Sequence, residues 1–159
     1  MNTALHAVES SGIGRLLRES LWAYPIVETL HIIGLGIVYG SVVVVDLRLL
    51  GLSRSVSARA LARHALPWTA GAFCLVLATG LLMFTAHAAD FLGNRVFFLK
   101  MGLILTAGVN AALLHTSAWK ESQAWDTRAM PPPQVRLQAA LSIVIWTGVI
   151  ACGRLLAYT

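Results

Sequence analysis

Four long apolar stretches dominate the chain and limit the class of fold that it can adopt. They run over about residues 21–50, 66–86, 96–115 and 137–157. Each is about as long as, or longer than, the roughly 20 residues that an α-helix needs to cross the hydrocarbon core of a bilayer. Within that core, helices satisfy their own backbone hydrogen bonds. The sequence therefore predicts four transmembrane helices in one domain of residues 1–159.

The composition supports a membrane protein. The chain is 57% hydrophobic and 12% charged, whereas a soluble domain is about half apolar and about a quarter charged. We therefore expect the lipid bilayer to be its main partner. The 12 Lys and Arg exceed the 7 Asp and Glu, but they form no basic run of the kind that binds nucleic acid.

The short connections predict antiparallel neighbours, and so an all-α, up-down four-helix bundle. Residues 10–20 are expected to form a short amphipathic helix along the outer membrane surface, with Ile13, Leu16 and Leu17 on one side. Gly36 and Gly40 form a GxxxG spacing, which suits close approach between helices.

The positive charges favour one orientation. Most of them lie at the inner end of the first span or in the connections after the first and third spans: Arg48, Arg54, Arg59, Arg63, Lys120, Arg128 and Arg136. Lys and Arg accumulate on the cytoplasmic side of membrane proteins. This pattern predicts a multi-pass protein of a bacterial inner membrane, with both termini on the outer, periplasmic side.

Ionisable residues interrupt the first span in a regular way. At 100° per residue, Glu28, His31, Tyr39 and Asp46 share one face of the helix, and the opposite face is Ile, Val, Leu and Gly. A charge at the centre of a span costs about 2.5–3.5 kcal/mol on the insertion scale. The polar face is therefore expected to turn into the bundle.

The depths of these residues predict an outer ionisable layer. Counted at about 1.5 Å per residue from the middle of each span, Glu28, His31, Lys100 and Arg154 lie roughly 8–12 Å to the outer side. One interpretation is a structural cluster in which Glu28 neutralises Lys100 or Arg154 and hydrogen-bonds to His31. The other is a net-positive pocket for a quinone headgroup, a haem propionate or another small anion.

A second set of ionisable residues lies near the inner edge, at about 13–18 Å from the middle. It consists of Asp46, Arg48, His64 and His115. The simplest interpretation of this set is interfacial residues. His87 is expected at the outer end of the second span, close to water.

The positions of the histidines are compatible with a haem b site and disfavour a di-iron or zinc site. The Glu28–His31 pair has the Glu-x-x-His spacing of di-iron bundles. Such bundles need two copies of this spacing, and only one is present here. A structural zinc site likewise has too few ligands. For an axial pair on one haem iron, His64 and His115 differ in depth by about 4–5 Å, and His31 and His87 by about 8–9 Å. Up to two haems, one near each surface, are compatible with these depths.

Several segments resemble a known family. They are "WAYPIVETLHIIGL", "VVDLRLLG", "FFLKMGLILTAGVNAALLH" and "GRLLAY". Together they resemble a family of uncharacterised four-helix bacterial inner-membrane proteins. The resemblance runs over nearly the whole chain from Trp22, and it implies no assigned activity. The architecture is more distantly similar to small b-type cytochromes and to the membrane domains of copper-resistance proteins, by analogy of layout alone.

Two functions are compatible with these features. The first is a small membrane redox or electron-transfer subunit that binds haem b or quinone, with His31 as ligand or proton group and Glu28, Lys100 and Arg154 setting its charge. The second is a non-enzymatic accessory subunit of a larger complex, or a small-solute or metal permease component. Both predict other membrane or periplasmic subunits as partners.

Overall fold

The computed structural model describes residues 2–116, 119, 125–127 and 129–158. Its four long helices are α3 (Ala23–Leu49), α4 (Ala58–Ala86), α6 (Arg95–Thr116) and α8 (Pro133–Leu155). All four are long and apolar enough to cross a membrane. The described part of the chain contains helices and no strands, which confirms the predicted all-α class.

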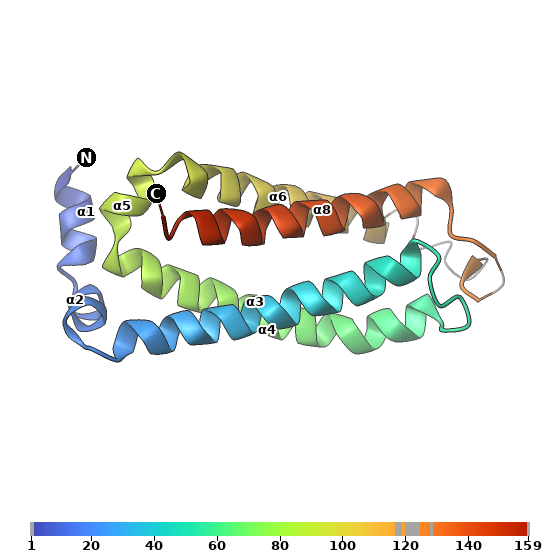
Figure 1. Ribbon diagram of the computed structural model, residues 1–159, viewed down its shortest axis with the longest axis horizontal. Helices are drawn as coiled ribbons and strands as arrows, with labels where there is room; N and C mark the ends of the chain where they lie inside the picture. Colours follow the sequence, from blue (N-terminus) through green and yellow to red (C-terminus); the bar gives the residue numbers. More distant parts are fainter. Residues whose placement is uncertain (1, 117–118, 120–124, 128, 159) are drawn as a thin grey trace.

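The long helices form two antiparallel hairpins (Figure 1). α3 packs along α4, α6 packs along α8, and the two hairpins meet mainly along α3 and α8. Both chain termini lie at one end of the bundle, which we call the terminal end. The opposite end, the loop end, holds the α3–α4 and α6–α8 connections. The up-down bundle predicted from the short connections is thus confirmed.

The close approach between α3 and α4 occurs at Gly34. A Cβ atom added to Gly34 would lie 2.8 Å from Cγ2 of Val76 on α4. Cβ atoms added to Gly36 or Gly40 would meet nothing within 4 Å. The GxxxG spacing of Gly36 and Gly40 therefore misidentified the contact, because these two glycines lie on another side of α3.

α4 begins earlier than the predicted span. Ser57 is its N-cap, and its hydroxyl accepts a hydrogen bond from the backbone N–H of Ala60 at 3.1 Å. Arg59 and Arg63 therefore lie on the helix and not in the loop where the sequence suggested them. Pro67 lies inside α4, and its missing N–H removes one backbone hydrogen bond of the helix.

Three short helices cover the terminal end: α1 (Asn2–Glu9), α2 (Gly12–Glu19) and α5 (Ala88–Gly93). α2 confirms the predicted helix before the first span, with Leu17 buried and its other large apolar side chains exposed. α1 and α5 were not predicted. Arg18 of α2 donates to the carbonyl of Ala86 at 2.9 Å and also to that of Glu9, and thereby links this cover to α4.

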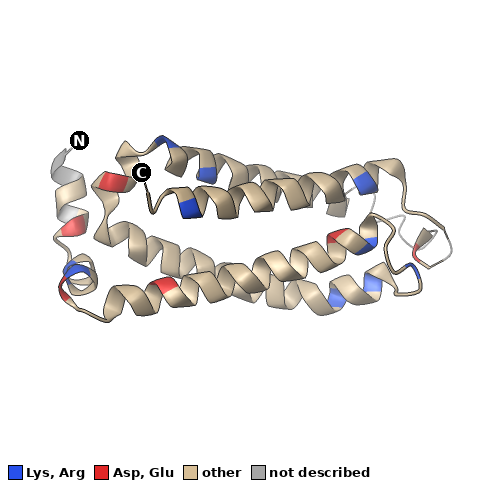
Figure 2. Cartoon of the chain, in the orientation of Figure 1, with Lys and Arg blue, Asp and Glu red and all other residues tan. Residues whose placement is uncertain are grey.

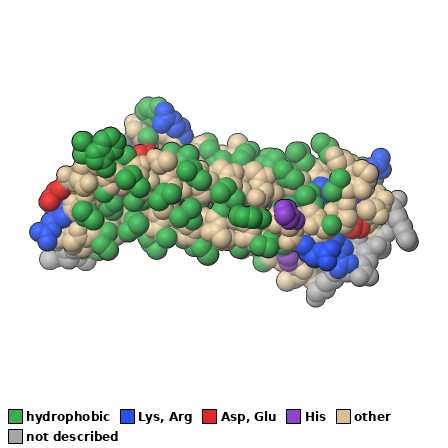
Figure 3. All heavy atoms as spheres, turned by 90° about the horizontal axis from the view of Figure 1, so that it is seen from below, with side chains coloured by type: hydrophobic (Ala, Val, Ile, Leu, Met, Phe, Trp, Pro, Cys, Tyr) green, Lys and Arg blue, Asp and Glu red, His purple; other side chains and the backbone are tan. Residues whose placement is uncertain are grey.

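The surface has the pattern of a membrane protein. Charged residues gather toward the two ends of the long helices, and the middle of each helix carries none (Figure 2). One face is largely covered by hydrophobic side chains, with His side chains near one end and Lys and Arg side chains toward both ends (Figure 3). Leu105 and Val144 are 71% and 68% exposed, as suits contact with lipid. The chain is thus a multi-pass membrane protein. The predicted loop charges Lys120 and Arg128 lie outside the described residues.

Candidate functional site

His31 contacts α4 through a hydroxyl group. Its Nδ1 lies 2.8 Å from Oγ1 of Thr79, and Thr79 is buried. The imidazole also faces Gly80, where an added Cβ would lie 3.3 Å from Cε1 of His31. The polar face of α3 therefore does turn into the bundle at this level, and a glycine leaves the space that the ring occupies.

The Thr79 hydroxyl determines which nitrogen of the neutral imidazole carries the proton. Thr79 Oγ1 donates its single proton to the backbone carbonyl of Leu75, at 2.7 Å. With its proton on that carbonyl, the hydroxyl accepts from His31, and Nδ1 is the donor in this arrangement. Nε2 of the neutral ring then keeps its lone pair, which is the form that binds a metal or accepts a proton.

Lys100 reaches the same region from α6. Its ammonium lies close enough to His31 for an electrostatic interaction between them. It also lies over a glycine of α8, because a Cβ on Gly153 would be 3.5 Å from Nζ of Lys100. Buried Cys152 of α8 is a further neighbour of Lys100. All four long helices therefore contribute to one polar region around His31 and Lys100, which we call the His31–Lys100 site.

The other two members of the predicted outer layer are exposed, and no hydrogen bond or ion pair within the described part of the chain joins them to His31 or Lys100. Glu28 is exposed, and it forms no ion pair with any described residue. Arg154 is also exposed. Its guanidinium donates to the hydroxyl of Tyr158 and lies 4.7 Å from the centre of that ring. The structural cluster in which Glu28 neutralises Lys100 or Arg154 is therefore wrong for the described residues.

The remaining residues of the polar face of α3 contact α8. The hydroxyl of Tyr39 lies 3.0 Å from Oγ1 of Thr147. Asp46 is only 5% exposed, lies beside Ser142, and its Oδ2 has no hydrogen-bond partner among the described residues. The predicted inward orientation holds for Tyr39 and Asp46, and these contacts join the two hairpins.

Arg48 organises the loop end and is more than an interfacial anchor. Its side chain is 2% exposed. Nε donates to the carbonyl of Val56 at 2.5 Å, and Nη2 donates to the carbonyl of Asp126 and, at 3.4 Å, to that of Arg54. One guanidinium thus joins the α3–α4 connection to the α6–α8 connection.

Asp126 completes this joint with its carboxylate. Oδ2 accepts from the Ser57 hydroxyl at 2.5 Å and Oδ1 accepts from the backbone N–H of Ala58 at 2.6 Å, so a distant acid caps the first turn of α4. Burial alone would raise the pKa of the Asp126 carboxyl. The hydrogen bonds from Ser57 and Ala58, helped by the charge of Arg48, outweigh burial and hold that pKa below its ordinary value of 3.8.

The other histidines have separate surroundings. His64 and His115 are exposed. Nδ1 of His115 bonds to the carbonyl of Ala111 in its own helix, at 2.8 Å. His87 contacts Asp90 at 3.4 Å, with its ring edge-on to Tyr24. In the described residues no hydrogen bond or ring contact joins His64 to His115, or His31 to His87.

Metal sites built from acids, thiols and imidazoles are absent from the described part of the chain. No group of three or more His, Cys, Asp or Glu side chains there can hold a metal ion.

Comparison with known proteins identifies a family but no function. Residues 10–159 match the model of a family of unknown function, DUF6644. No curated protein sequence matches the chain. No solved structure matches it either.

Proposed function

The chain belongs to the family DUF6644, and because that family has no assigned activity, we propose a function from the contacts of the chain itself. It is a small membrane redox or electron-transfer subunit that holds haem b or a quinone headgroup at the His31–Lys100 site. The observation that carries this proposal is the contact of His31 with Thr79, which leaves Nε2 as a free electron-pair donor close to a cationic side chain.

The residues present suit either group. An imidazole whose Nδ1–H is already bonded is the usual form of an axial haem ligand, and it can also accept a proton from the hydroxyl of a quinol. The Lys100 ammonium suits an oxygen with negative charge, such as a haem propionate or a quinone carbonyl. Haem b would supply one-electron chemistry, and quinone would supply two-electron, two-proton chemistry. The chain contributes binding, orientation and the protonation state of Nε2.

An absorption spectrum of the detergent-purified protein, oxidised and reduced, together with extraction of bound quinone, tests this function. We expect a Soret band or a bound quinone in the wild type, and its loss in His31→Leu. Thr79→Val should reduce occupancy, because the imidazole then loses the acceptor of its Nδ1–H. A colourless, quinone-free protein would refute the proposal.

The matched control is His64→Leu, which changes an exposed histidine at the other end of α4. It should leave the occupancy of the His31–Lys100 site unchanged. If His64→Leu or His115→Leu removed a Soret band and His31→Leu did not, the haem would lie at the loop end. That result would favour the axial pairing of His64 with His115 over the site proposed here.

A second candidate function, an accessory subunit of a larger membrane complex, is favoured by Glu28. This carboxylate is exposed on α3 and lacks a cationic partner among the described residues, although charges in a span normally face protein or water. A partner subunit that covers Glu28 would explain its position. Purification in a mild detergent with a fixed partner, and loss of that partner in Glu28→Gln, would support this candidate.

We also propose a membrane and an orientation. The location is a bacterial inner membrane, with the loop end in the cytoplasm and both termini in the periplasm. Support comes from Arg54, Arg59 and Arg63, which all lie at the loop end. Reporter fusions at the two termini test it, since a periplasm-dependent enzyme such as alkaline phosphatase should be active at both and a cytoplasm-dependent one at neither.

A further inference from the structure

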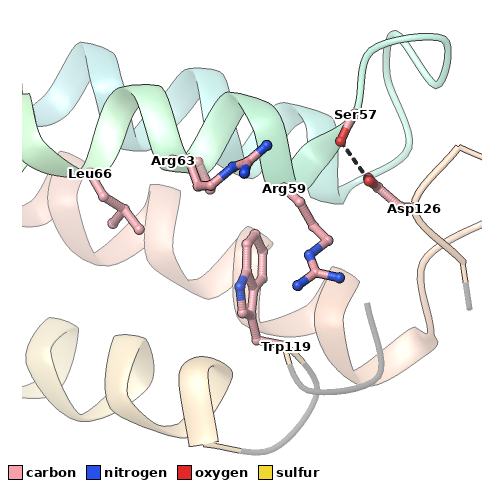
Figure 4. A pocket seen from close by; sticks show the side chains of 7 residues that line it. Ser57, Arg59, Arg63, Leu66, Trp119 and Asp126 are labelled. Carbon is pink, nitrogen blue, oxygen red and sulfur yellow. Dashed lines mark hydrogen bonds between the residues drawn. The ribbon is translucent and has the colours of Figure 1, made fainter. Parts of the chain in front are cut away.

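A pocket of about 420 Å³ lies at the loop end, away from the His31–Lys100 site. Its walls include Arg59, Arg63 and Leu66 from one side of α4, and Trp119 and Asp126 from the α6–α8 connection (Figure 4). The contact between Ser57 and Asp126 closes one side of the pocket, and Leu66 lies at the other. The first turns of α4 and the distant α6–α8 connection thus form one pocket.

The two arginines give the pocket a positive charge that no described residue neutralises. They are four residues apart and so lie on the same face of α4. Neither guanidinium has a hydrogen bond or an ion pair with any residue that the structure describes. The one acid in the wall, Asp126, is already engaged by Ser57 and Ala58 and faces Arg48. Two guanidinium groups in one pocket, neither with a partner among the described residues, are a geometry that binds phosphate oxygens.

The pocket changes from cationic to apolar along α4. From Arg59 to Leu66 the helix rises by about 10 Å, and Leu66 is 43% exposed at the start of the long apolar stretch of this helix. Trp119 adds an aromatic ring of the kind that is common at the level of lipid headgroups. A free phosphate ion would use only the arginines, whereas a phospholipid would use both parts.

We propose that this pocket binds the headgroup of an anionic phospholipid. Arg59 and Arg63 hold the phosphate, and the acyl chains follow α4 past Leu66 into the bilayer. Basic pockets at the membrane surface are known to recognise anionic headgroups in this way. The proposal is independent of any cofactor at the His31–Lys100 site.

Native mass spectrometry of the full-length protein, titrated with phosphatidylglycerol or phosphatidylcholine, tests the proposal. We expect phosphatidylglycerol to bind at least tenfold more tightly than phosphatidylcholine. The double variant Arg59→Gln/Arg63→Gln should lose that preference, and each single variant should lose part of it. The matched control is Arg54→Gln/Arg136→Gln, which removes the same charge from exposed positions at the same end of the bundle. It should bind within twofold of the wild type.

A variant at the apolar end separates the lipid from a free phosphate. Leu66→Ser should weaken phosphatidylglycerol binding, and inorganic phosphate at millimolar concentration should not displace the lipid. Displacement by inorganic phosphate would show a simple anion site and overturn the proposal. It would also be overturned by equal affinity for the two lipids, or by equal losses in the pocket variant and its control, since the latter would show an effect of surface charge alone.

Discussion

Replacement of Arg48 by Met should destabilise the protein more than any other single loss of positive charge at the loop end. The guanidinium is buried and donates to carbonyls in both connections, those of Val56, Arg54 and Asp126. Met keeps much of the length and the apolar part of the side chain and removes all three hydrogen bonds. The expected effect is therefore separation of the two connections, with little loss of packing.

The magnitude follows from these contacts. A hydrogen bond from a charged donor contributes about 1.5–3 kcal/mol. The contact with Arg54 is long, at 3.4 Å, so two of the three bonds account for most of the effect, about 3–6 kcal/mol. Nη1 of Arg48 is buried without a partner among the described residues, and its removal returns about 1–3 kcal/mol. With the middle of each range, the net loss of unfolding free energy is about 2.5 kcal/mol.

Unfolding in mixed micelles with increasing SDS, followed by tryptophan fluorescence, measures this loss. Trp125, one of five tryptophans, is 5% exposed and packs in the cluster of buried side chains at the loop end with Leu49 and Val135, so the total emission should change when this region opens. The control is Arg54→Met, which removes an exposed arginine from the same connection and should cost less than about 0.5 kcal/mol. If Arg48→Met and Arg54→Met had equal effects, Arg48 would not join the two connections.

Three further predictions concern packing, pH and helix contact. Gly34→Val should destabilise the protein by about 1–3 kcal/mol through a clash with α4, whereas Gly36→Val, which points into open space, should have little effect in the same SDS titration. Because folding lowers the pKa of Asp126, its contribution is present above pH about 4 and disappears as the pH falls through the lowered pKa. The difference in thermal midpoint between wild type and Asp126→Asn should shrink accordingly, and a pH-independent difference would refute this. Tyr39→Phe should cost about 0.6 kcal/mol, and adding Thr147→Val should cost little more, as a double-mutant cycle would show.

The arrangement of the helices could be predicted from the sequence because lipid imposes it. A span must be long and apolar, so the number of long helices followed from hydropathy. Short connections force antiparallel neighbours, so the up-down packing of these helices followed from the lengths of the connections. The start of α4 could not be found in this way. Residues 58–65 are helical although they carry Arg59 and Arg63, because the helix extends past the apolar region and is capped by Ser57 and Asp126.

Only part of the candidate site could be predicted from the sequence. Helical periodicity placed His31 on an inward face, and depth placed Lys100 at the same level. The residues that shape the site, Thr79, Gly80 and Gly153, carry no charge and lie on helices whose rotation hydropathy does not define. Hydropathy and depth do not define the rotation of α8 either. They therefore placed Arg154 in the site, although the structure has it exposed beside Tyr158.

The bond from Arg48 to Asp126 also has a consequence for the order of assembly, because it joins residues 78 positions apart. When the first hairpin, α3 with α4, has been synthesised and inserted, the residues that complete its loop end do not yet exist. Asp126 supplies both a backbone carbonyl that accepts from Arg48 and the carboxylate that caps α4, and neither is available until the ribosome has passed this residue. The first hairpin must therefore remain in the bilayer with this end open, and the second hairpin closes it when it inserts.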